Sequence, residues 1–383
     1  MFTVKQVASA FNLDEMATPA YYICTQTVKE NFRKVKLICD KHDLLPFFSF
    51  KAFPTILDMP FLESEQAKIN FDVANHAELS YLLEKLSSAE LSGRAISITG
   101  PMINNNLAFK QALELMSASA ADCYINVESI QMIEELAQEI AQQPQVKVGV
   151  RIAWDDLADQ KVPSRFGASL PSFEVFAHLL KLGLKGFHFH SPSTKDRHSY
   201  IRLVEKLKAT YGDLLGKLEY INFGGSIPGG SLAELEAILI AMRDIAPQSI
   251  KIQIEPGALF FGGAILFASR VCGTQFFAER PMHVITLDAS RECHLKWTNP
   301  CIVPPENASA DEEQAPTLFG GAACFELDVF KVCYWPKQHL PKVGDLIFFE
   351  SVSCYSVAWN TSFNGIKTAE INYLTPRPTA QPE

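Results

Sequence analysis

The sequence predicts a parallel (β/α)8 barrel followed by an all-β domain. Eight short segments rich in Val, Ile and Phe alternate with amphipathic segments of helical period between about residues 47 and 255. After residue 262 the pattern changes to strand-like segments separated by Pro, Gly and charged turns. A doubly wound open sheet is the alternative for the first part, but no Gly-rich dinucleotide fingerprint follows its first strand.

The periodicity gives approximate bounds for each element. The expected barrel strands are 47–51, 68–73, 95–99, 122–126, 147–153, 185–190, 218–223 and 250–255. The expected helices between them are 76–87, 106–117, 128–142, 172–182, 196–210 and 231–245. The expected strands of the β domain are 271–277, 283–288, 323–332, 345–350 and 352–358.

Residues 20–25 are also strand-like, although they precede the barrel. We therefore expect residues 1–25 to join the β domain, residues 26–261 to form the barrel and residues 262–383 to form the C-terminal β domain.

Composition narrows the class of protein. The net charge of −9 argues against a nucleic-acid partner. Nine scattered cysteines without a CxxC pair suggest reduced thiols in the cytoplasm, and they form no metal-site pattern. The N-terminus has no signal-peptide core, and the longest apolar run, 257–269, is too short to cross a membrane. We expect a cytoplasmic protein that binds neither nucleic acid nor membrane and holds no metal.

Lys51 is the most informative residue. It ends the first expected barrel strand, which is apolar, and Pro54 follows three residues later. A lysine at a strand end can simply extend its amine to solvent. Burying it is unfavourable unless the protein uses it, and a neutral lysine amine can form a Schiff base.

Other unusual residues stand at the ends of the later strands. In a (β/α)8 barrel these ends form the active-site face. The residues are Asp72, Glu78, Arg151, Arg165, His188, His190, Asn222 with the Gly224–Ser226 segment, and Glu255. Each alone has a structural explanation, such as an N-cap, a core imidazole or a plain turn. Together they supply the parts that pyridoxal phosphate requires: an amine, a Gly-rich phosphate cradle, a stacking imidazole and a carboxylate for the pyridine nitrogen.

The same residues stand in motifs that resemble the fold-type III pyridoxal-phosphate decarboxylases, the family of ornithine, diaminopimelate and carboxynorspermidine decarboxylases. The resemblance runs collinearly over roughly residues 18–370. Its matching segments are 50–53, 71–79, 150–156, 164–168, 323–328, 343–350, 354–358 and 363–365. It implies an alanine-racemase-like barrel with a β domain.

The resemblance also implies roles for individual residues. Lys51 would form the internal aldimine, and His188 would stack on the cofactor ring. Cys324 of the partner subunit would return a proton after CO2 leaves, which implies a homodimer with shared active sites. The other implied cofactor contacts are Asp72, Glu78, Arg151, Ser191, Gly224, Gly225, Ser226, Glu255, Gly257 and Tyr355.

Departures from the family pattern bear on the substrate. Ala258 stands where many members carry Arg after Glu-Pro-Gly, and Phe325 stands where ornithine and diaminopimelate enzymes carry an acidic residue. His-Phe-His-Ser at 188–191 replaces the usual His-x-Gly-Ser. These features, with the 287–294 and 359–366 segments, are similar to carboxynorspermidine decarboxylases. The expected substrate-side residues are Asp288, Glu292, His294, Phe325, Glu326 and Asp328.

The implied activity is therefore α-decarboxylation of a small-molecule amino acid with a long polar side chain, such as carboxynorspermidine or carboxyspermidine in polyamine biosynthesis. The alternatives are a citryl-diamino acid of siderophore or antibiotic assembly, and an ornithine- or lysine-type substrate. An amino-acid racemase is disfavoured by the Cys324–Asp328 motif. A non-catalytic regulator is disfavoured because the cofactor residues are present.

Overall fold

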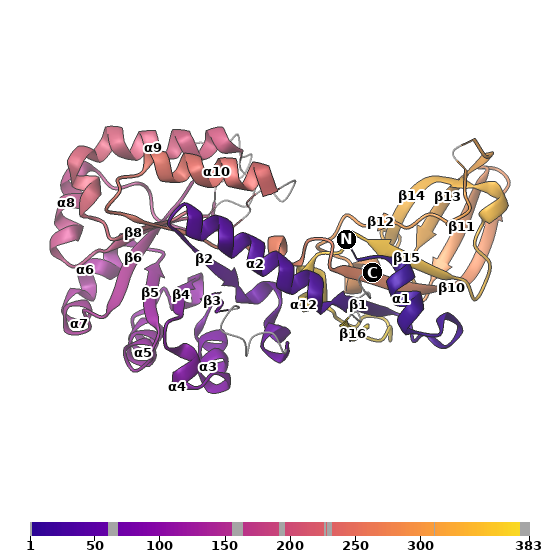
Figure 1. Ribbon diagram of the computed structural model, residues 1–383, viewed down its shortest axis with the longest axis horizontal. Coiled ribbons are helices and arrows are strands. Elements are labelled where there is room, and N and C mark those ends of the chain that lie inside the picture. The colour runs from indigo at the N-terminus through magenta and orange to yellow at the C-terminus, as the bar shows by residue number, and fades with distance from the viewer. Residues whose placement is uncertain are drawn as a thin grey trace, which may run out of the picture. The chain divides into compact units, whose positions relative to one another are not determined.

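Eight parallel strands close into a barrel, which confirms the predicted fold class (Figure 1). The computed structural model describes residues 2–59, 68–154, 164–190, 196–225, 227, 232–309 and 311–375. The chain divides into a barrel unit, Phe32–Phe260, and a β unit that combines Met1–Asn31 with Phe261–Glu383.

The barrel strands follow one another in sequence order around the barrel. They are β2 (Leu44–Ser49), β3 (Asn70–Val73), β4 (Ala95–Thr99), β5 (Asp122–Val127), β6 (Val146–Ile152), β7 (Gly186–Phe189), β8 (Tyr220–Asn222) and β9 (Lys251–Ile254). The barrel closes where β2 pairs with β9, with Leu44 opposite Ile252. All eight lie close to their predicted positions.

Helices surround the barrel strands (Figure 1). They are α2 (Thr25–Lys41), α3 (His76–Lys85), α4 (Ser88–Leu91), α5 (Asn106–Ser117), α6 (Ile130–Glu135), α7 (Ala137–Gln142), α8 (Phe173–Lys181), α9 (Arg197–Tyr211) and α10 (Leu232–Ile245). Several begin at a side-chain cap: Asn75, Asn105, Ser172 and Asp196 each accept a backbone N–H of the first turn.

Aromatic side chains fill the barrel interior below the active-site face. Phe47, Tyr124 and Tyr220 form a buried cluster with Ala95, and the Tyr220 hydroxyl donates to Asn126 Oδ1 at 2.7 Å. A Cβ on Gly186 would lie 2.3 Å from the Tyr220 ring, so only glycine leaves room for it. The packed interior leaves the C-terminal strand ends as the place for a site.

The end of the first strand differs from the prediction. β2 ends at Ser49, and Lys51 lies in a short 3-10 turn, η2 (Phe50–Ala52), with its side chain exposed. The Phe53 N–H donates to Phe50 O, which closes the turn, and Pro54 has no N–H to continue a strand. Lys51 therefore follows the strand end and is less buried than the sequence suggested.

The β unit is built from eight strands. They are β1 (Ala20–Cys24), β10 (Ile265–Phe277), β11 (Met282–Leu287), β12 (Cys301–Ile302), β13 (Gln314–Gly320), β14 (Val329–Pro336), β15 (Leu346–Glu350) and β16 (Glu370–Leu374). The long main path runs β12-β15-β10-β11-β13-β14. β1 pairs with β10 antiparallel and with β16 parallel, so the chain's first strand belongs to this sheet.

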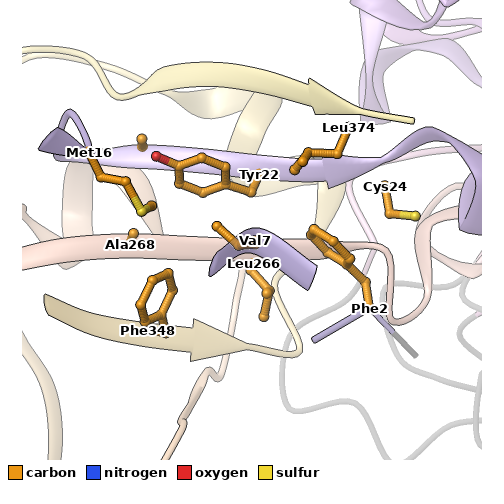
Figure 2. Close-up of a cluster of buried hydrophobic side chains, with 10 residues drawn as sticks. Phe2, Val7, Met16, Tyr22, Cys24, Leu266, Ala268, Phe348 and Leu374 are labelled. Carbon is orange, nitrogen blue, oxygen red and sulfur yellow. The ribbon is translucent and has the colours of Figure 1, made fainter. Parts of the chain in front are cut away.

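An apolar cluster holds the N-terminal segment to the β unit (Figure 2). Phe2 and Val7, the latter from α1 (Val4–Ala10), pack with Tyr22 of β1, Leu266 of β10 and Leu374 of β16. Burial of each such side chain contributes about 1.5–3 kcal/mol. The N-terminal segment thus contacts distant parts of the sequence through this apolar cluster and through the pairing of β1 with β10 and β16.

The unit is mostly β rather than all-β. Besides α1 it contains α11 (Arg291–His294) and α12 (Cys354–Trp359). The prediction of a strand at 352–358 was wrong, because Ser353 Oγ accepts the Tyr355 N–H and starts a helix there. The predicted strand 323–332 begins only at Val329, and β12, β13 and β16 were not predicted.

Candidate active site

A cavity of about 470 Å³ opens at the C-terminal ends of the barrel strands. It brings together five predicted site residues that lie far apart in the sequence: Lys51, Asp72, Arg151, His188 and Glu255. The other lining residues are Ala74, Thr99, Gly100, Pro101, Ser164, Arg165, Phe166 and His190. All of them belong to the barrel unit.

Glu255 is a buried carboxylate that the site keeps ionised. Its oxygens lie 3.1 and 3.2 Å from His188 Nε2, and Oε1 accepts Asn222 Nδ2 at 2.7 Å. Burial alone would raise the pKa of Glu255, but the imidazole of His188, with further attraction from His190 and Lys51, lowers that pKa to about 2. The Glu255 carboxylate can therefore accept a charge-assisted hydrogen bond from an N–H or O–H group of a ligand.

Asn222 connects this carboxylate to the glycine segment that follows β8. Its Oδ1 accepts the Gly224 N–H at 2.8 Å, and Gly224 O accepts the Glu255 N–H at 2.7 Å. Gly224 has φ of +66°, and a Cβ on Gly225 would lie 2.8 Å from Glu255 O. Glycine is thus required at both positions by conformation or by close approach.

Asp72 lies near Glu255, but its pKa shifts in the opposite direction. Its side chain is buried, and Oδ1 has no hydrogen-bond partner within the described part of the chain. Burial, and then repulsion from Glu255, raise the pKa of Asp72 well above its ordinary value, against attraction from Lys51. The pKa values of these two neighbouring carboxyl groups are thus shifted in opposite directions.

Arg151 reaches the cavity from β6 with its charge already paired. Its Nη1 lies 2.9 Å from Glu128 Oε1, and Glu128 Oε2 accepts the Gly167 N–H at 2.6 Å. The Arg151 and Arg165 guanidinium carbons lie 4.6 and 3.9 Å from the centroid of the Phe166 ring. Glu128 therefore fixes both Arg151 and the loop that carries Phe166.

Two further barrel-unit predictions lie near the cavity without lining it. Glu78 accepts the Ala74 N–H at 2.7 Å and so shapes the turn after β3. Gly257 is buried and accepts the Phe260 N–H. The predicted residues Ser191 and Ser226 lie outside the described residues.

The remaining predicted residues belong to the β unit. Tyr355 is half-buried in α12. Cys324, Phe325 and Glu326 are exposed in the turn before β14, and Phe325 is 48% exposed. This turn presents a thiol, an aromatic ring and a carboxylate side by side in the sequence.

Four predicted substrate-side residues have structural partners instead. Asp328 accepts the N–H groups of Arg291 and Ala323, and Asp288 accepts Ser269 Oγ and the Arg270 N–H. Glu292 is paired with Arg291 and Lys296. His294 accepts the Ser290 N–H at Nδ1, and its Nε2 lies 3.0 Å from Lys367 O, so both ring nitrogens are occupied.

Several residues in or next to the cavity were given no role by the sequence. Asn222 and His190 were noted at strand ends, but neither was predicted as a catalytic, cofactor or substrate residue. Thr99 and Gly100 end β4 in the same way, and a Cβ on Gly100 would lie 2.0 Å from Ala74 O. Glu128 had no signal in the sequence beyond following β5, because only the fold brings it to Arg151.

Comparisons with known proteins agree with this architecture. A family model described as "Pyridoxal-dependent decarboxylase, pyridoxal binding domain" matches residues 25–262. An ornithine decarboxylase from Mus pahari is 24% identical over 281 residues, which cover 64% of this chain and 60% of that protein. A carboxynorspermidine/carboxyspermidine decarboxylase from Campylobacter jejuni is 25% identical over 233 residues, which cover 55% of this chain and 57% of that protein. These matches span less than two thirds of the relatives' own length.

A solved structure shows the same fold over nearly the whole chain. The Paramecium bursaria Chlorella virus arginine decarboxylase bound to agmatine has a TM-score of 0.74 at 18% identity, and the match covers 97% of this chain and 99% of that one. Among the described residues of the present chain, no helix has the length and apolarity to cross a membrane. The same residues contain no group of three or more side chains placed to hold a metal ion.

Proposed function

Because this chain belongs to the family of pyridoxal-dependent decarboxylases, we propose that it removes the α-carboxyl group of an amino acid. One observation carries the proposal: the barrel cavity joins the Lys51 amine to a Glu255 carboxylate that His188 and Asn222 hold ionised. These two groups are what a pyridoxal enzyme needs at the two ends of the cofactor ring.

Pyridoxal 5′-phosphate is the cofactor of this family, and the cavity residues fit it. His188 Nδ1 and Asp72 Oδ1 are buried polar atoms without a described partner, and Gly225 leaves space where any side chain would overlap Glu255 O. We propose that twelve residues hold the cofactor: Lys51, Asp72, Glu78, Arg151, His188, Ser191, Gly224, Gly225, Ser226, Glu255, Gly257 and Tyr355. When bound, it supplies an electron sink for the carbanion left by CO2.

The protein's own groups would do the rest. Glu255 would accept a hydrogen bond from the protonated ring nitrogen, and it keeps its charge because its pKa is about 2. His188, which is oriented by the contact of its Nε2 with Glu255, would pack against the cofactor ring. Lys51 would hold the cofactor through its amine. Cys324 of the partner subunit returns a proton to the substrate carbon, as the exposed thiol of a free cysteine is able to do. This arrangement requires a head-to-tail homodimer, which is part of the proposal.

The substrate that we propose is a long amino acid with an internal secondary amine, such as carboxynorspermidine or carboxyspermidine. Support comes from the Campylobacter jejuni relative of that name and from Phe325, which offers apolar surface and no charge to a short terminal ammonium. Glu326 is the exposed carboxylate beside it, whereas Glu292 and Asp328 already have partners.

A specific observation supports a second substrate class. Arg165 lines the barrel cavity, and among the described residues no carboxylate lies within ion-pair distance of its guanidinium. A citryl-diamino acid would bring several carboxylates, and an arginine fork suits them. Such a substrate would belong to siderophore or antibiotic assembly rather than to polyamine biosynthesis.

The test is CO2 release by cofactor-loaded protein with carboxynorspermidine, carboxyspermidine, a citryl-diamino acid, ornithine, lysine and diaminopimelate. We expect carboxynorspermidine or carboxyspermidine to exceed ornithine in kcat/KM by roughly tenfold to a hundredfold, because a buried ammonium loses a charge-assisted hydrogen bond at Phe325. A citryl compound as the best substrate, with a selective loss in Arg165→Gln, would favour the second class. Ornithine or diaminopimelate as the best substrate would contradict the argument from Phe325.

A further inference from the structure

His190 lines the cavity but is not among the proposed cofactor-binding residues. It follows β7 and lines the same cavity as Lys51, His188 and Glu255. Its side chain lies directly against the glycine segment after β8. A Cβ on Gly224 would lie 3.0 Å from His190 Cβ and Cδ2, and a Cβ on Gly225 would lie 3.7 Å from His190 Nε2.

The contact places an imidazole edge beside backbone that is suited to an anion. Successive glycines near the start of a helix expose N–H groups, and α10 begins at Leu232, a few residues after this segment. The Gly224 N–H is used by Asn222. Among described residues, no hydrogen bond is formed by the Gly225 N–H or by either ring nitrogen of His190. Two adjacent donors are therefore available to one ligand.

The charge state of His190 defines what it offers. Burial lowers the pKa of His190 to about 3, against attraction from Glu255 and with further lowering by Lys51 and Arg151. At neutral pH the ring is therefore uncharged, with one N–H donor and one acceptor nitrogen. Arg151, a charged donor that also lines the cavity, is already paired with Glu128. The donor that lies against the glycine segment is therefore the uncharged imidazole of His190.

We infer that His190 donates a hydrogen bond to the phosphate group of pyridoxal phosphate, beside the Gly225 N–H. The inference rests on the proposed function, because it takes the cofactor to be bound in this cavity. It makes His190 a cofactor-binding residue that acts through an N–H donor. Consequently a neutral amide of similar reach should replace it, whereas an aromatic ring without a donor should not.

The experiment compares binding of pyridoxal phosphate and of pyridoxal, which lacks the phosphate, to the apoprotein by calorimetry. The variants are His190→Phe, which keeps a ring but removes the donor, and the matched control His190→Gln, which keeps a neutral N–H. We expect His190→Phe to weaken binding of pyridoxal phosphate by roughly tenfold to a hundredfold, the usual effect of a hydrogen bond to a charged group. His190→Gln should bind it nearly as tightly as the natural protein, and pyridoxal affinity should be unchanged in both variants.

Two results would overturn the inference. One is unchanged affinity of His190→Phe for pyridoxal phosphate. The other is an equal loss of pyridoxal affinity, which would mean that the imidazole acts by packing. Thermal unfolding of each apoprotein checks the fold, and His190→Ala replaces the Phe variant if that variant does not fold. If the natural protein bound no pyridoxal phosphate, the proposed function itself would fail. If the natural protein bound it and the variants behaved alike, only the inference about His190 would fail.

Discussion

Replacing Asp72 by asparagine should stabilise the folded apoprotein at neutral pH. The Asp72 carboxyl group is buried beside Glu255, and its pKa is raised well above the value of 3.8 that it has in the unfolded chain. Between these two pKa values the folded state binds more protons than the unfolded state. The stability that Asp72 contributes is therefore complete below its unfolded pKa and is lost as the pH rises.

The change in the free energy of unfolding with pH gives the size of the expected effect. One proton taken up by folding changes the free energy of unfolding by about 1.4 kcal/mol per pH unit. Asp72→Asn removes the proton but keeps the shape. The variant and the natural protein should be nearly equal at about pH 4, and the advantage of the variant should grow by about 1.4 kcal/mol per pH unit above that, until the folded pKa is passed.

Glu255→Gln is the matched control, because its effect has the opposite sign. The Glu255 pKa falls from 4.5 to about 2 on folding, so its contribution is present above pH 4.5 and is lost as the pH falls toward 2. Its removal should cost about 3 kcal/mol at neutral pH, with little change between pH 6 and 8. Because repulsion from Glu255 is one cause of the Asp72 shift, Asp72→Asn should gain less in the Glu255→Gln background.

The assay is urea unfolding of the apoproteins at several pH values. A stability difference for Asp72→Asn that does not change with pH would refute the raised pKa of Asp72. A full, unreduced gain in the double variant would refute its coupling to Glu255.

Three other perturbations test separate parts of the site. Gly225→Ala should lose binding of pyridoxal phosphate in a calorimetric titration, because the added Cβ would lie 2.8 Å from Glu255 O. The control Gly216→Ala should bind normally, because its Cβ would lie 3.8 Å from Ser249 Oγ, an ordinary van der Waals distance. Glu128→Gln should lower the thermal midpoint, because it leaves the Arg151 charge unpaired where breaking a buried pair costs about 3–5 kcal/mol; an unchanged midpoint would contradict this. Mixed Lys51→Ala and Cys324→Ala subunits should recover roughly a quarter of the activity after random exchange, and no recovery after verified exchange would argue against shared sites.

The fold was predictable where local sequence and global architecture agree. The barrel strands are short apolar segments, and every helix that was predicted in the barrel unit appears near its expected position. The β unit was harder to predict. All residues of β1, including Tyr21 and Tyr22, are buried, and this continuous apolar segment can be recognised in the sequence. β16 has mixed exposure, and its position depends on pairing with β1. The stretch 352–358 has strand-like composition, but the Ser353 cap turns it into α12.

The residues of the candidate site were predictable from their positions at strand ends, whereas their hydrogen-bond and ion-pair partners were not. Asp72, Arg151, His188 and Glu255 were singled out because they stand at or near strand ends, and the barrel brings them together. Their hydrogen bonds and ion pairs involve residues that no local pattern identifies, such as Asn222 with Glu255 and Glu128 with Arg151. In the β unit, Glu292 and His294 stay predictions as substrate-side residues; Lys296 pairs with Glu292, and the Ser290 N–H donates to His294.

The position of the cofactor is the central claim, and one measurement tests it most directly. Protein loaded with pyridoxal phosphate is treated with borohydride, which fixes the cofactor to the amine that holds it, and the labelled peptide is identified by mass spectrometry. We expect the label on Lys51, with no label on that peptide in Lys51→Ala. A label on another lysine, or no label in a protein that decarboxylates its substrate, would contradict it.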